Sequence, residues 1–178
     1  TRIGFINILK KMNANIKIKN LKKEAGEPIG NLIIKSSSLK SIKCPEALVP
    51  SAIDEFPLLF IVASLVKGVS KFNGIGELRH KESDRIKSIE IGLNQIGIKT
   101  KSTKDSLTIF GNPNIQIKKL LKISPKEDHR IAMAFFCLSQ LLKGKVKIKN
   151  FQTVNTSFPK FLFTMKKIGA NFEIKKTN

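Results

Sequence analysis

Two short charged motifs combine residue types that could bind and transform an anionic substrate. One motif reads Lys-Glu-Ser-Asp-Arg over residues 81–85, and the other reads Asp-His-Arg over residues 128–130. An arginine guanidinium can bind a carboxylate or a phosphate through two parallel hydrogen bonds. A carboxylate held among such cations is ionised, and it can act as a base or, where water is partly excluded, as a proton carrier. The motifs therefore predict a site that binds an anion and moves a proton.

Each motif lies where a helix is expected to begin. Helices are predicted to start at Asp54, within residues 80–85, at Asp128, and near residues 156–159, where Ser157 could form the cap. The first turn of a helix has unpaired backbone N–H groups and carries the positive end of the helix dipole. If these four ends converge, their basic side chains would form a site for a multiply anionic small molecule.

The same residues could instead have purely structural roles. Asp54 and Asp128 could act only as helix caps. Lys81 and Arg85 are four residues apart and are expected to share a helix face, which could be a solvated, salt-bridged first turn. His129 could be a structural histidine beside the apolar helix that follows it. Spacing alone leaves both explanations open.

The surrounding sequence repeats a pattern of helices and strands. Residues 2–19, 84–100 and 158–175 each read as an amphipathic helix, a turn-forming residue and a short alternating strand. Residues 54–72 and 128–148 each begin with Asp, continue as a strongly apolar helix, and reach Gly before a strand. Apolar residues on nearly every side of a helix predict that it is buried.

Further strands are expected at Asn31–Lys35 and Leu107–Phe110. With them, the chain reads as an α/β (α+β) repeat of about 70–85 residues, and such units bury their apolar faces only by packing against one another. We expect two nearly whole units and a fragment of a third, packed around buried helices. The first helix would begin at the first residue without a preceding cap, which suggests a piece of a longer protein.

The overall composition limits the class of protein. Hydrophobic residues make up 41% of the 178 residues, which is enough to build a core and argues against disorder. No apolar run approaches the roughly 20 residues of a membrane helix, so no membrane partner is expected. The formal charge is +20, but lysines are scattered and Trp and Tyr are absent. Nucleic-acid binders usually concentrate cations on one face, so we expect general attraction for anions and no specific nucleic-acid partner.

The two cysteines, Cys44 and Cys137, form neither a disulfide framework nor a metal-binding spacing. A reducing cytoplasm is the simplest location for such a chain. Cys137 lies within an apolar helix and is expected to be part of the core. Neither a metal nor a cofactor is predicted.

Four stretches of the chain together resemble the 5-enolpyruvylshikimate 3-phosphate synthase family. They occur in that family's order and at similar spacing, and the resemblance covers essentially the whole chain. The Lys-Glu-Ser-Asp-Arg and Asp-His-Arg motifs are much more specific together than either is alone. The stretches are Ile53–Pro57, Glu77–Arg85, Asp128–Met133 and Asn155–Pro159.

The resemblance implies both the fold and the reaction. Family members have two similar domains, each built from three βαβαββ units, and residues 1–178 would be most of the C-terminal domain. The N-terminal domain, with much of the shikimate 3-phosphate site, would lie outside this sequence and would be a partner of this chain. The reaction transfers the enolpyruvyl group of phosphoenolpyruvate to the 5-hydroxyl of shikimate 3-phosphate and releases phosphate. It serves aromatic amino-acid biosynthesis and needs no metal.

The resemblance also implies two catalytic carboxylates. Asp54 matches the acid beside the 5-hydroxyl, where it would act as a base or an orienting acceptor. Glu82 matches the acid that is thought to move a proton at the methylene carbon of phosphoenolpyruvate. Protonation of that carbon builds positive charge on its neighbour, which nearby carboxylates stabilise. Glu77 departs from the pattern, because some members have an asparagine there.

Five residues are implied to bind substrate. Lys81 matches a contact to shikimate 3-phosphate that could also meet the departing phosphate, and Arg85 and Arg130 match the arginines that grip phosphoenolpyruvate. His129 would support that grip. Asn155, the fifth, stands where some members carry a lysine, which is a departure from the family's pattern.

Two other functions remain open from the sequence. A related enolpyruvyl transferase acts on a nucleotide sugar and typically uses a reactive cysteine on a loop, for which this chain offers no exposed candidate. A basic RNA-binding module would make use of the excess charge, and RNA binding that survives moderate salt would favour it.

Overall fold

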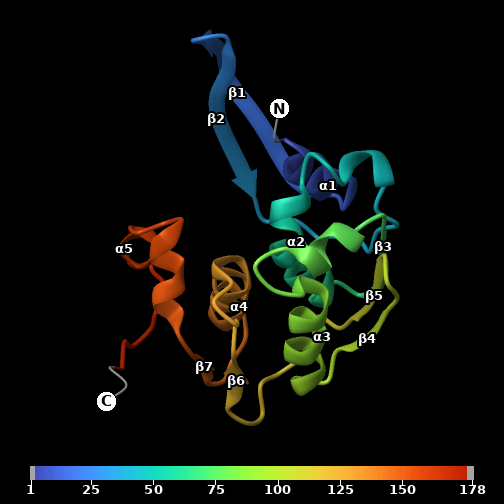
Figure 1. The fold of residues 1–178 in the computed structure, drawn as a ribbon. Coiled ribbons are helices and arrows are strands. Elements are labelled where there is room, and N and C mark those ends of the chain that lie inside the picture. Colours follow the sequence, from blue (N-terminus) through green and yellow to red (C-terminus); the bar gives the residue numbers. More distant parts are fainter. Residues whose placement is uncertain (1–2, 176–178) are drawn as a thin grey trace.

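The computed structural model describes residues 3–175, in which five α-helices pack with three small sheets (Figure 1). In chain order the helices and strands are α1 (Gly4–Lys11), β1 (Asn15–Glu24), β2 (Glu27–Lys35), α2 (Phe56–Ser64), β3 (Gly68–Asn73), α3 (Arg85–Gln95), β4 (Lys99–Ser102), β5 (Ser106–Gly111), β6 (Leu121–Ile123), α4 (His129–Leu141), β7 (Val146–Ile148) and α5 (Phe161–Lys167). Short 3-10 helices span Glu46–Leu48, Ile53–Glu55, Gly76–His80 and Phe151–Thr156.

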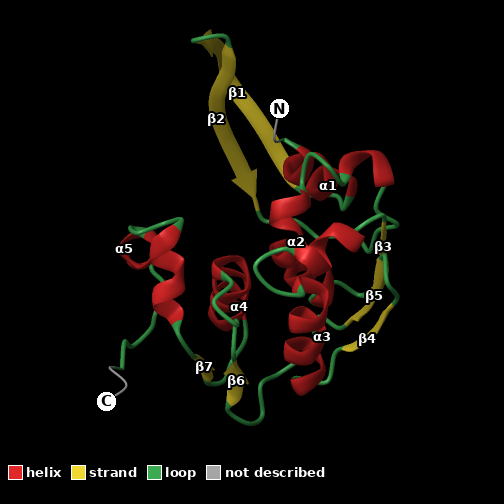
Figure 2. Cartoon of the chain, in the orientation of Figure 1, coloured by secondary structure: helices red, strands yellow, loops and turns green. Residues whose placement is uncertain are grey.

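Helices α2, α3 and α4 form the centre of the molecule, and each contacts the other two. The three-stranded sheet covers α2 and α3 on one side, while α5 lies beyond α4 on the other (Figure 2). The prediction of buried helices is confirmed for α2 and α4, because most of their apolar side chains are buried. Phe56 and Phe60 of α2 meet Phe72 of β3 edge to face, with ring centroids 5.1–5.9 Å apart. This aromatic cluster fixes α2 against the sheet.

Most of the expected strands are present around this centre. In the three-stranded sheet, β5 pairs antiparallel with β3 on one side and with β4 on the other. Strands β6 and β7 pair in parallel, and α4 crosses over between them. The strands predicted at Asn31–Lys35 and Leu107–Phe110 fall within β2 and β5. No helix of the described residues is both long and apolar enough to span a membrane.

The β1–β2 hairpin projects away from the body of the molecule (Figure 1). One of its faces is apolar, yet Ile18, Leu21, Leu32 and Ile34 are 42, 68, 47 and 66% exposed. A two-stranded hairpin with an uncovered apolar face is at best marginally stable in water. This face is therefore suited to packing against further protein.

The expected strand near the C-terminus does not form, because residues 171–175 have no regular secondary structure. A strand needs a neighbour to satisfy its backbone groups. Here Gln140 takes that role with its side-chain amide: its Oε1 accepts from the Asn171 N–H at 2.9 Å, and its Nε2 donates to the Asn171 carbonyl at 3.3 Å. The side chain occupies the groups that a neighbouring strand would use.

Two expected helix starts differ from the structure, and a third is not tested by it. Ser157 does not cap α5, which begins at Phe161, because the Ser157 N–H closes the preceding 3-10 helix by bonding to the Val154 carbonyl at 3.2 Å. Asp54 lies within the 3-10 helix Ile53–Glu55, so it precedes α2 and does not cap it. The first helix begins at Gly4, and the expected start at residues 1–2 lies outside the described residues.

Gly92 controls how closely α3 and α4 pack. A Cβ atom at this position would overlap the ring of Phe135, which is fully buried in α4. We expect Gly92→Ala to lower the free energy of unfolding by roughly 1–3 kcal/mol through overpacking, despite the higher helix propensity of alanine. Urea denaturation followed by circular dichroism measures this. Lys87→Ala, at an exposed position of α3, is the control and should change stability by less than about 0.5 kcal/mol.

Candidate active site

A buried arginine brings the two charged motifs together. Arg85 is the first residue of α3, and its side chain is only 1% exposed. Its guanidinium is paired with three carboxylates: Nη2 lies 2.5 Å from Oε2 of Glu82, Nε lies 2.9 Å from Oδ2 of Asp128, and Nη1 lies 3.5 Å from Oδ1 of Asp54. Residues from three segments, far apart in the sequence, therefore meet at one point.

Asp128 joins the beginnings of α3 and α4. It is completely buried, and as the N-cap of α4 its Oδ1 accepts from the backbone N–H groups of Arg130 at 2.9 Å and Ile131 at 3.3 Å. Its Oδ2 accepts from Ser83 Oγ at 3.0 Å and from Arg85 Nε at 2.9 Å. The predicted cap is confirmed, but the same side chain also holds the buried arginine.

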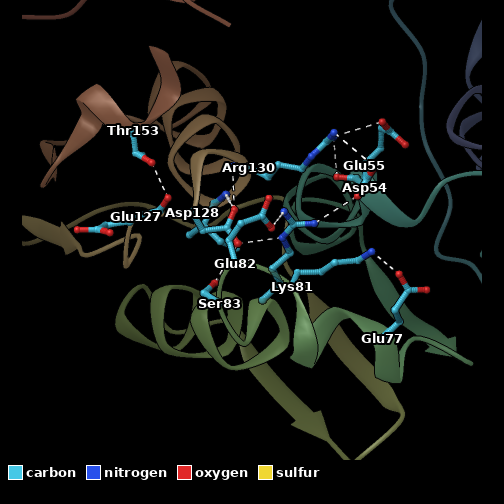
Figure 3. A network of polar contacts seen from close by, with 12 residues as sticks. Asp54, Glu55, Glu77, Lys81, Glu82, Ser83, Glu127, Asp128, Arg130 and Thr153 are labelled. Carbon is cyan, nitrogen blue, oxygen red and sulfur yellow. Dashed lines mark hydrogen bonds and ion pairs between the residues drawn. The ribbon is translucent and has the colours of Figure 1, made fainter. Parts of the chain in front are cut away.

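Arg130 extends from the first turn of α4 to the segment before α2 (Figure 3). Its Nη1 donates to the Asp54 carbonyl at 3.0 Å and lies 3.3 Å from Oε1 of Glu55. Its Nη2 lies 3.6 Å from Oδ2 of Asp54. Asp54 thus lies between the two arginines and pairs with both.

Lys81 lies in the connection that precedes α3, so the expectation that it shares a helix face with Arg85 is wrong. The chain is extended at Lys81 and turns into the helix only after Asp84, the N-cap residue. Lys81 Nζ forms an ion pair with Glu77, which lies in the 3-10 helix Gly76–His80 (Figure 3). Glu82 is half-exposed beside it, at 48% of its side-chain surface.

His129 and Asn155 lie at the margin of this cluster. His129 is the first residue of α4 and is half-buried. Asn155 is exposed in the 3-10 helix Phe151–Thr156, which Thr153 ties to the Glu127 carbonyl through a 2.5 Å hydrogen bond (Figure 3). Within the described part of the chain, no hydrogen bond or ion pair joins Asn155 to either arginine.

One nitrogen of the Arg85 guanidinium makes no hydrogen bond to the described residues. Its Nη1 is buried and, among the described residues, has no hydrogen-bond partner, although Asp54 lies within ion-pair distance. Buried donors in proteins are almost always bonded, and an unbonded one calls for an explanation such as a ligand. An anionic oxygen bound between Arg85 and Arg130 would satisfy this donor. The described residues hold no group of three or more His, Cys, Asp or Glu side chains placed to bind a metal.

Comparison with known proteins decides the family. The family model for EPSP synthase (3-phosphoshikimate 1-carboxyvinyltransferase) matches residues 1–165. The chain belongs to the EPSP synthase family. It is 41% identical over 177 residues to the 3-phosphoshikimate 1-carboxyvinyltransferase of Zymomonas mobilis, covering 98% of this chain and 39% of the relative. It is 42% identical over 171 residues to that of Hydrogenovibrio crunogenus, covering 96% and 38%. The chain thus spans about two fifths of the length of these relatives.

Solved structures agree with this assignment to the EPSP synthase family. The EPSP synthase of Acinetobacter baumannii superposes with a TM-score of 0.89 at 39% identity, covering 97% of this chain and 40% of that one. The enolpyruvyl transferase NikO from Streptomyces tendae superposes with a TM-score of 0.68 at 12% identity, covering 99% and 37%, and shares the fold alone. The predicted family and the predicted α/β fold are both confirmed.

Two contacts of this cluster are not predictable from the sequence motifs. The motifs leave Asp128 open as a helix cap or a site residue, and they do not indicate its bond to Arg85, which lies 43 residues away in sequence. They also do not single out Glu55, which pairs with Arg130 over a separation of 75 residues. A second acid directly after Asp54 was the available signal for Glu55. No spacing rule indicates the bond between Asp128 and Arg85, because it depends on how α3 and α4 pack.

The pair between Arg85 and Asp128 predicts a large loss of stability when its charge is removed. Asparagine caps a helix as well as aspartate does, so Asp128→Asn keeps the cap but leaves a buried cation poorly compensated. We expect a loss of about 3 kcal/mol in the free energy of unfolding, measured by urea denaturation. Asp84→Asn is the matched control, since Asp84 caps α3 but is partly exposed, and it should lose no more than about 1 kcal/mol. Equal losses would contradict the role of burial.

The thiol of Cys44 is predicted to react slowly. It is buried in the segment between β2 and α2, and burial raises its pKa to about 11. At pH 8 the thiolate, which is the reactive form, would therefore be roughly a hundredfold scarcer than for an ordinary exposed thiol. Mass spectrometry after iodoacetamide treatment of the native and the urea-unfolded chain measures this, and fast labelling of Cys44 in the native chain would show that it is a reactive cysteine.

Proposed function

We propose that this chain provides the phosphoenolpyruvate-binding side of a 3-phosphoshikimate 1-carboxyvinyltransferase. The complete enzyme would transfer the enolpyruvyl group of phosphoenolpyruvate to the 5-hydroxyl of shikimate 3-phosphate and release phosphate. The observation that carries this proposal is the buried Nη1 of Arg85, which makes no hydrogen bond to the described residues and lies close to Arg130, a second arginine that two carboxylates hold in place. Two guanidinium groups and a nearby lysine match a small ligand that carries both a carboxylate and a phosphate.

The acids would move the protons of the reaction. Glu82 is partly exposed beside Arg85 and would give a proton to the methylene carbon of phosphoenolpyruvate. The adjacent carbon then becomes electron-poor, and the 5-hydroxyl oxygen attacks it while its proton passes to Asp54. Glu82, now a carboxylate, would take a proton back from the new methyl group as the C–O bond to phosphate breaks. This restores the double bond, with Lys81 near the departing phosphate.

In this proposal the described part supplies one side of the cleft, and residues 1–178 are most of a C-terminal domain. A separate N-terminal domain would supply the other side and much of the shikimate 3-phosphate site. Two observations support this: the chain spans 39% of the length of the Zymomonas mobilis relative, and the β1–β2 hairpin has an uncovered apolar face. We also propose a cytoplasmic location, which the two free cysteines support.

Turnover measurements test this division of the site. The isolated chain, mixed with phosphoenolpyruvate and shikimate 3-phosphate, is expected to release no phosphate above background, because half of the cleft is absent. A chimera in which this chain replaces the matching segment of the Zymomonas mobilis relative should release phosphate. Robust turnover by the isolated chain would contradict the proposal that half of the cleft is absent from it. A folded chimera without turnover would refute the proposed transferase function. In an active chimera, Glu82→Gln should abolish most of the phosphate release.

Phosphoenolpyruvate binding to the isolated chain tests the role of the arginines. Arg130→Ala removes a guanidinium from the site, and we expect affinity to fall at least about tenfold, since a hydrogen bond to a charged group contributes about 1.5–3 kcal/mol. Titration followed by ¹⁵N NMR spectra measures the dissociation constant. Lys122→Ala, on the exposed face of β6, removes the same charge outside the cluster and serves as the control. Equal effects of the two variants would mean that only overall charge attracts the ligand.

A further inference from the structure

Arg79 makes an unusually complete set of hydrogen bonds outside the cluster around Arg85. Its Nε donates to the Lys104 carbonyl at 3.1 Å, and its Nη2 donates to the Thr103 carbonyl at 2.5 Å and to Ser102 Oγ at 3.3 Å. Its Nη1 pairs with Oδ2 of Asp84 at 2.7 Å. One guanidinium thus binds the turn between β4 and β5 and, at the same time, the cap of α3.

These bonds hold both ends of the short loop that carries Lys81 and Glu82. Arg79 lies just before this loop, in the 3-10 helix Gly76–His80, and Asp84 lies just after it. Oδ1 of Asp84 also accepts from the Lys87 N–H at 2.9 Å, which fixes the start of α3. The ion pair between Arg79 and Asp84 therefore closes residues 80–83 into a ring.

The turn between β4 and β5 is itself firmly anchored. Oδ1 of Asp105 accepts from the Gly76 N–H at 2.5 Å, and its backbone carbonyl accepts from the Ile75 N–H at 3.2 Å. Ser102 Oγ donates to Oε2 of Glu90, on α3, at 2.8 Å. The turn is thus tied to the start of the 3-10 helix and to α3, and it offers Arg79 a fixed set of acceptors.

We infer that Arg79 is a positioning residue for Lys81 and Glu82. It would not touch substrate, and its effect would pass through the loop that it closes. Arginine suits this role because its planar fork can reach four acceptors at once, whereas the single ammonium of lysine cannot span the carbonyls of the turn and Asp84 together. The meaning of this positioning for catalysis rests on the proposed function, but the effect on the loop does not.

The test compares Arg79→Lys and Arg79→Ala with Lys104→Ala in the isolated chain. Lys104 is exposed and contributes only its backbone carbonyl to Arg79, so its replacement removes the same charge and keeps the contact. Hydrogen exchange of the amides at residues 80–84 is expected to be about ten- to a hundredfold faster in both Arg79 variants and unchanged in Lys104→Ala. In ¹⁵N NMR spectra the shifts should be confined to residues 76–86 and 102–106, while amides of α4 keep their exchange rates.

Phosphoenolpyruvate titration of the same variants adds a functional measurement. We expect a three- to tenfold higher dissociation constant for Arg79→Lys, and no change for Lys104→Ala, since roughly 1 kcal/mol of positioning corresponds to this range. Arg79→Lys keeps the charge and most of the side chain, so it still reports if Arg79→Ala fails to fold.

The inference is overturned if Arg79→Lys leaves loop exchange as in the parent, or if it destabilises all helices equally, which would indicate only a general structural role. If the parent chain does not bind phosphoenolpyruvate, the proposed function loses its support, while the exchange measurement still decides whether Arg79 holds the loop.

Discussion

The burial of one cation, the guanidinium of Arg85, places constraints on the rest of the site. A charge removed from water is very costly unless opposite charges and hydrogen bonds surround it. Arg85 is 1% exposed, and the surrounding chain supplies Glu82 from its own loop, Asp128 from the start of α4 and Asp54 from the segment before α2. Stable packing of α2, α3 and α4 therefore requires that three acids converge, and the convergence that stabilises the fold also assembles the site.

The same arrangement compensates the charges of the cations that bind an anion in the proposed function. Asp54 and Glu55 neutralise Arg130, and Glu77 neutralises Lys81, so no cation of the cluster faces its neighbours without compensation. A bound anion would have to replace some of these contacts, which makes its binding an exchange of partners. The acids that it displaces would remain close, where proton transfer needs them. The overall charge of +20 adds attraction at long range.

Much of this organisation was predictable from local patterns, and the exceptions have physical causes. The buried helices α2 and α4 follow from apolar residues on nearly every side, and the cap Asp128 follows from residue type and position. At residues 171–175, alternating apolar and polar residues predicted a strand that does not form. The pattern is insufficient because a strand depends on a partner that sequence alone does not identify. Likewise, Lys81 has helical spacing from Arg85, but residues 81–83 form a bend and the helix begins only after its cap, Asp84.

The bonds that matter most in the site are those that sequence spacing cannot reveal. Asp128 meets Arg85 only because α3 and α4 lie close together, and Gly92 permits that approach by leaving room for the ring of Phe135. Gly92 carries no charge and lies seven residues beyond Arg85 in α3. It nevertheless helps to set the distance between Arg85 and Asp128. The apolar packing between α3 and α4 and the polar contacts at their N-termini therefore depend on each other. A change in either is expected to move the arginines relative to the acids.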